Sequence, residues 1–253
     1  MLTFSEAQLM QWLLPLLWPA LRTLSMLATV PVLSSRSVPA RVKISLALLV
    51  ALCAQASLPP MPVVSLDSPV AFAMVVQQVL VGVTIGFAAR IVFTALEFAG
   101  ELIGLQMGLN FAGFFDPATG SQGTATSRFF STMGSLLFVV VNGHLLLLAA
   151  VLRSFEAFPV SDAPFEVIRT LQPQVWGAEV FRLGLWIALP IVAMLLFVNL
   201  VLGVISRVAQ QLQIFSVGFP ITVSIGLIGT LMTLPMLQGP FTSALERMLA
   251  LFQ

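Results

Sequence analysis

The chain has 253 residues, of which 58% are hydrophobic and 8% are charged, with a mean hydropathy of +1.04 and a net charge of +1. A water-soluble domain carries about 25% charged residues, because its surface must be hydrated. The composition therefore excludes a soluble protein and predicts an all-α, polytopic membrane protein. It also excludes recruitment of nucleic acid, because a net charge of +1 produces no strong positive potential that would attract phosphates.

The N-terminal part predicts a first helix over residues 12–33 that contains three prolines and, near its middle, Arg22. An arginine facing lipid at mid-membrane costs several kcal/mol, so we expect Arg22 to face protein or water. The connector 34–43 carries only basic charges and is predicted to be cytoplasmic. A second apolar run, 44–58, is short for a span of about 20 residues and ends in an extended, proline-rich linker.

The third apolar run, 70–93, contains a GxxxG pair, Gly82 and Gly86, which predicts close contact with another helix. The run continues through a polar stripe that a pitch of about 100° per residue places on one helix face. Its members are Arg90, Thr94, Glu97 and Glu101. Snorkelling at the membrane interface is one interpretation. A water-filled lumen or a partner subunit is favoured, because the two glutamates repel each other without a common partner.

The stretch 104–128 contains five glycines and turns polar from Asp116 onward. Glycine and proline at this density favour turns over a continuous helix. Non-helical backbone within a membrane must be buried in protein or line a watery cavity. The stretch is therefore a candidate gate, plug or re-entrant loop, and an ordinary solvent loop is the alternative.

The C-terminal half predicts a span over 129–152, an amphipathic connector over 153–182, and a helical hairpin from the runs 183–205 and 214–237. The whole chain contains about six spans, or seven if 98–115 crosses fully. We divide its single unit, 1–253, into N-terminal helices (1–103), a plug-like loop (104–128), a helix with its connector (129–182) and the hairpin (183–253). Such short, proline-rich spans suggest helices that pack mainly against other protein chains.

Catalytic chemistry is not predicted. Ser135 and His144 are separated by about 13 Å along one helix, too far for a nucleophile and its base. Asp116 has no second aspartate with which to share a proton, and no nucleotide motif or metal-ligand cluster occurs. We expect no cofactor, and we interpret Asn142 and His144 as packing or interface residues. A small-molecule or ion secondary transporter remains the alternative function, although no duplicated half is found.

The run GELIGLQMGLNFAGFFDP, residues 100–117, closely resembles the family of the flagellar biosynthetic protein FliR and its virulence counterpart, the T subunit of type III secretion export apparatuses. Five further elements are similar in the same order and lie at 18–43, 138–148, 188–190, 199–207 and 211–220. The sequence motifs QMGL and NGH favour the flagellar branch.

This resemblance implies a non-enzymatic, single-copy subunit of an export gate in the bacterial inner membrane, at the flagellar basal body. The implied partners are the P and Q channel subunits, the B subunit, exported unfolded flagellar proteins and membrane lipid. The plug loop of the family corresponds by motif to Gln106, Met107, Asn110, Phe111, Phe114, Asp116 and Pro117. With Phe115, the phenylalanine rings are expected to exclude water and ions from the lumen.

Overall fold

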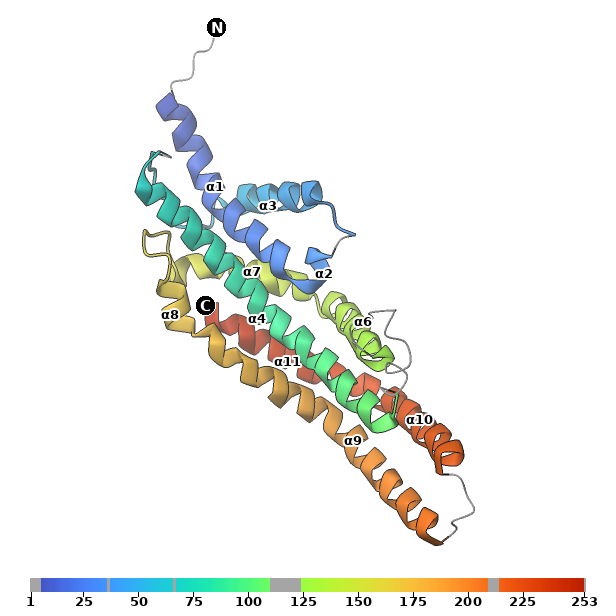
Figure 1. Ribbon diagram of the computed structural model, residues 1–253. Coiled ribbons are helices and arrows are strands. Elements are labelled where there is room, and N and C mark those ends of the chain that lie inside the picture. The colour runs from blue at the N-terminus through green and yellow to red at the C-terminus, as the bar shows by residue number, and fades with distance from the viewer. Residues whose placement is uncertain (1–5, 36, 66, 110–123, 209–213, 253) are drawn as a thin grey trace. The chain divides into compact units, whose positions relative to one another are not determined.

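The computed structural model describes residues 6–35, 37–65, 67–109, 124–208 and 214–252. The described residues form helices and no strands, which confirms the all-α prediction (Figure 1). The α-helices are α1 Glu6–Thr29, α2 Pro31–Ser34, α3 Ala40–Ala54, α4 Pro69–Met107, α6 Ala125–Val140, α7 Gly143–Ala157, α8 Glu166–Leu171, α9 Gly177–Val208, α10 Ile214–Thr233 and α11 Gln238–Leu249. The 3-10 helices are η2 Pro173–Trp176, η3 Leu234–Leu237 and η4 Ala250–Phe252.

The chain divides into two compact units that both include parts of α4 and α11. Unit 1 comprises Met1–Ile91, Asn142–Trp176 and Leu245–Gln253, and unit 2 comprises Val92–Val141 and Gly177–Ala244.

Unit 1 is built on the close approach of α1 and α4. A Cβ at Gly82 would collide with the Ser25 hydroxyl oxygen and the Arg22 carbonyl oxygen, and one at Gly86 would lie 2.6 Å from the Thr29 Cβ. The predicted GxxxG contact is therefore confirmed. Trp18, on α1, is fully buried, and its indole N–H donates to the Pro62 carbonyl over 3.2 Å. This bond attaches the proline-rich linker to α1, and residues 59–65 of the linker have no regular secondary structure. Its predicted extended conformation stays a prediction.

Unit 2 is built on the second half of α4. A Cβ at Gly100 would lie 2.8 Å from the Ser127 Cα of α6, and one at Gly184 of α9 would lie 2.8 Å from the Ala95 carbonyl oxygen. Small residues thus allow α4 to approach both helices closely. Further along the chain, α9 contacts α10, which confirms the predicted C-terminal hairpin.

The number of predicted spans was too high. Among the described residues, three segments are long and apolar enough to cross a membrane, and they lie at Pro69–Met107, Pro173–Val208 and Val217–Phe252. A fourth is gained only if α6 and α7 count as one bent span.

Two local causes explain the difference. The predicted span 129–152 is interrupted at Asn142, whose left-handed backbone (φ 54°, ψ 35°) separates α6 from α7. Asparagine tolerates this conformation better than most residues, because its short side chain can bond locally. The run 44–58 yields only the 15-residue α3, and the run from residue 70 continues unbroken to Met107 instead of starting a separate span at 98.

Candidate functional site at the end of α4

The end of α4 is defined by Gly108, which has a positive φ of 79°. The Gly108 N–H donates to the Leu105 carbonyl over 3.1 Å, and the Leu109 N–H donates to the Gly104 carbonyl over 3.0 Å. These two bonds form a Schellman motif, in which glycine occupies the left-handed position at least cost. The helix therefore runs four residues into the stretch 104–128 that we predicted as turns. At the other end of that stretch, Ala125–Arg128 is also helical.

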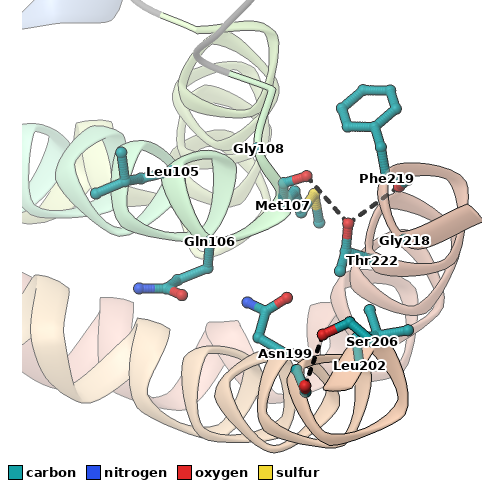
Figure 2. Close-up of a pocket in the computed structure, with 11 residues that line it drawn as sticks. Leu105, Gln106, Met107, Gly108, Asn199, Leu202, Ser206, Gly218, Phe219 and Thr222 are labelled. Carbon is teal, nitrogen blue, oxygen red and sulfur yellow. Dashed lines mark hydrogen bonds between the residues drawn. The ribbon is translucent and has the colours of Figure 1, made fainter. Parts of the chain in front are cut away.

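A cavity of about 410 Å³ adjoins this helix end within unit 2 (Figure 2). It is lined by Leu105, Gln106, Met107, Gly108, Asn199, Leu202, Gly203, Ser206, Gly218, Phe219 and Thr222. The Thr222 hydroxyl donates to the Met107 carbonyl over 3.3 Å and to the Phe219 carbonyl over 3.0 Å. The first of these bonds attaches the C-terminus of α4 to α10.

Met107 is buried against Gly226, where a Cβ would lie 2.6 Å from the Met107 Cγ. The absence of a side chain at this position of α10 therefore makes room for Met107. The family resemblance assigned Gln106 and Met107 to the plug loop. The structure places both in the last turn of α4, beside the hairpin.

The two glutamates of the polar stripe bind the first turns of α6. A carboxylate oxygen of Glu97 accepts from the Ser131 hydroxyl over 2.7 Å, and one of Glu101 accepts from the Thr124 N–H over 3.1 Å. Thr124 is itself the N-cap, since its side chain accepts from the Ser127 N–H over 3.1 Å. Carboxylates are stabilised at a helix N-terminus because the free N–H groups and the helix dipole are positive there.

A second cavity of about 730 Å³ lies beside these glutamates in unit 2. It is lined by Thr94, Glu97, Phe98, Glu101, Ser127, Arg128, Ser131 and Thr132. The cavity gives the glutamates an open polar neighbourhood in addition to their bonds to α6. Their predicted place in a lumen or at a subunit interface stays a prediction.

The remaining predicted residues are not gathered at these cavities. Arg90 is an exposed residue of unit 1, and Asn142 and His144 are both exposed around the start of α7. Asn110, Phe111, Phe114, Phe115, Asp116 and Pro117 lie outside the described residues, so their predicted roles stay predictions. No group of three potential metal-ligating side chains occurs in the part of the chain that the structure describes.

The strongest polar cluster surrounds Arg22, which is fully buried in unit 1. Its guanidinium donates to the Gln78 side chain over 2.8 Å, to the Ser154 hydroxyl over 2.9 Å and to the Phe158 carbonyl over 2.8 Å. It also lies 3.6 Å from the centre of the Phe155 ring. The expectation that Arg22 faces protein or water is confirmed, and the surroundings are protein.

Sequence reasoning missed most partners in these clusters. A polar residue inside an apolar helix was the available signal for Gln78 and Asn199. No local pattern in the sequence pointed to the Ser154 hydroxyl or the Phe158 carbonyl as hydrogen-bond acceptors for Arg22.

The long apolar helices and a buried arginine whose guanidinium is hydrogen-bonded within the protein define a helical membrane protein. Residues 13–248 match the model of the family described as bacterial export proteins, family 1, and the chain belongs to that family. It is 40% identical to the flagellar biosynthetic protein FliR of Pectobacterium carotovorum subsp. carotovorum, covering 97% of this chain and 93% of that protein.

Two further relatives are also named flagellar biosynthetic protein FliR. The protein from Escherichia coli (strain K12) is 40% identical over 90% of this chain and 87% of its own length. The one from Aquifex aeolicus (strain VF5) is 34% identical over 90% of this chain and 88% of its own length. The resemblance to the FliR family is thus confirmed, and the chain is a membrane component of the flagellar export apparatus.

Proposed function

We propose that the chain is a non-enzymatic structural subunit of the flagellar type III protein export gate in the bacterial inner membrane. Together with the P and Q channel subunits, and contacted by the B subunit, it forms a pore through which unfolded flagellar proteins pass. The loop between α4 and α6 plugs the lumen of this pore at rest. The observation that carries the proposal is the nearly full-length similarity to flagellar biosynthetic relatives.

The exposed apolar surface of the C-terminal hairpin supports a role as a subunit. Trp186 and Phe197 of α9 are 63% and 68% exposed, and Leu231 and Met232 of α10 are 69% and 72% exposed. Contiguous apolar surface of this kind is covered by lipid or by other chains in the working protein.

The attachment of the loop supports its role as a plug. The loop leaves α4 at Gly108, and Thr124 at its far end is bonded to Glu101, which also belongs to α4. Both attachments therefore belong to one helix. The part between them can be shortened without removing either attachment.

The transporter alternative receives no comparable support. A transporter offers buried charge to its substrate at a mid-membrane site. Arg22 is the buried charged residue of the described part, and its three hydrogen bonds go to its own chain.

Shortening the loop within 110–120 tests the proposal. We expect the export complex to assemble normally while the membrane becomes leaky to ions, because an apolar constriction that excludes water has been removed. The measurement is ion conductance of membranes that contain equal amounts of assembled complex. As a matched control, leucine in place of Phe111, Phe114 and Phe115 keeps the constriction apolar and should remain tight, whereas serine at these positions should leak. Unchanged conductance in an assembled, shortened complex would contradict the plug.

A further inference from the structure

We propose that the cavity at the end of α4 binds a short extended segment of polypeptide through its main chain, namely a segment of an exported protein in transit. This inference rests on the proposed function and names a contact site for its substrate. It concerns only residues of unit 2.

The polar groups of the cavity match a peptide backbone. Gln106 on α4 and Asn199 on α9 direct their amide groups into the space between the two helices (Figure 2). Neither amide is hydrogen-bonded to another described residue, although each has a donor and an acceptor to satisfy. A peptide unit carries the same two groups, one N–H donor and one C=O acceptor. Two amides across a cavity can therefore pair with a main chain whatever its side chains are.

The rest of the lining argues against a charged ligand. All of the lining residues are uncharged. A phosphate, a nucleotide or a metal ion would lose its hydration there without gaining a counter-charge. The apolar lining comes from residues such as Leu105, Met107 and Phe219, and methionine adapts its shape to different side chains.

Glycines leave room for a backbone to approach. A Cβ added at Gly203 of α9 would have no atom within 4 Å, so the space in front of this residue is open. The cavity volume of about 410 Å³ lies in the range of ordinary ligand sites, roughly 300–1,000 Å³. Close approach of another backbone is one of the uses of glycine within regular structure.

A helix of a neighbouring subunit is the competing occupant. Small residues and amide side chains also occur where membrane helices pack together. A helix, however, satisfies its own main-chain N–H and C=O groups internally, whereas an extended chain presents them to a partner. The two amides, which no described residue binds, therefore favour an extended segment.

Site-specific photo-crosslinking in cells tests this assignment. A photoreactive amino acid at Gly203 should be accommodated, because the space there is open. A flagellar export substrate with a tightly folded C-terminal domain is stalled in the assembled apparatus. The matched control is the same amino acid at Gly177, which also has open space, lies on the same helix and does not line the cavity.

We expect crosslinks between position 203 and the stalled substrate to exceed those from position 177 at least about fivefold. The adducts should be distributed over many substrate residues, because the main chain is recognised. Crosslinks from position 203 only to a neighbouring subunit or to lipid, or equal yields from both positions, would overturn the assignment.

Filling the cavity supplies a second measurement. Gly203→Leu should lower the export rate about tenfold at an equal amount of complex, which corresponds to the loss of roughly one hydrogen-bonded contact. Gly177→Leu should export normally. Normal export by an assembled Gly203→Leu complex would overturn the site, and if that variant fails to assemble, the crosslinking result decides. A leak from the shortened loop without crosslinks at 203 would overturn only the cavity assignment and leave the proposed function standing.

Discussion

At the scale of single residues, Arg22 determines how unit 1 is held together. Its guanidinium joins α1 to α4 through Gln78 and to α7 through Ser154 and the Phe158 carbonyl. The planar guanidinium has five donors in a fixed arrangement, and it also stacks on the Phe155 ring. A lysine is a single point charge that cannot reproduce this geometry.

Arg22→Lys is therefore expected to destabilise the protein by about 2–4 kcal/mol, because buried acceptors at about 1–3 kcal/mol each lose their donor. For a chain of this size the thermal midpoint should fall by roughly 5–15 °C. The measurement is thermal unfolding of the purified protein in mild detergent.

The matched control is Arg90→Lys, which changes an exposed arginine of the same unit. Such surface substitutions usually stay within about 0.5 kcal/mol. Equal midpoints for the two variants would show that the hydrogen bonds of Arg22 add nothing to stability.

At the scale of elements, the glycines of α4 let neighbouring helices approach it closely. Its glycines at 82 and 86 contact α1, and its glycine at 100 contacts α6. In its best membrane window 67% of the residues are buried, against 22% for the window that includes α9. The sequence predicted the contact at Gly82 and Gly86 from the GxxxG pair, since small residues at this spacing share a helix face. It did not predict the contact at Gly100.

Glu101 on α4 supports the start of α6. Glu101→Ala removes the acceptor of the Thr124 N–H, and amide hydrogen exchange in the first turn of α6 should speed up about tenfold. Glu101→Gln keeps a side-chain oxygen that can accept from the Thr124 N–H but loses the negative charge, so its exchange should speed up less than that of Glu101→Ala.

The same pair of variants tests the predicted stripe. If the charge of Glu101 also faces channel subunits, both variants should weaken their co-purification with this chain. Normal recovery of the complex with Glu101→Ala would contradict that role and leave Glu101 with its helix-capping role alone.

At the scale of the whole molecule, the uneven burial of the long helices leaves apolar surface for lipid or other chains to cover. The membrane windows of Pro173–Val208 and Val217–Phe252 are only 22% and 28% buried. In the proposed gate, neighbouring chains and lipid would cover these surfaces.

Native mass spectrometry of the protein, co-expressed with its neighbouring genes and extracted in mild detergent, tests this expectation. We expect one copy of the chain in a large hetero-oligomer, because the exposed hairpin would be covered by channel subunits. Extraction of the protein expressed alone is the control. A stable monomer or homodimer from the co-expression would contradict the assembly and return attention to the transporter.

The sequence by itself determined the membrane class, the family resemblance, the hairpin and the need to shield Arg22. These features depend on the hydrophobicity of consecutive residues, on the spacing of residues along the chain and on short sequence motifs. It predicted too many spans, because hydrophobicity does not reveal that Asn142 interrupts a run or that residues 70–107 continue as one helix. Local turn signals also placed the end of α4 four residues too early.

Only the tertiary structure decided which groups meet. Arg22 and Ser154 are 132 residues apart in the chain, and Met107 and Thr222 are 115 residues apart. Hydrogen bonds over such separations depend on how helices pack, and packing is set by the complementary shapes of distant side chains. For the same reason, no local pattern could show that Gln106 and Asn199 face one cavity.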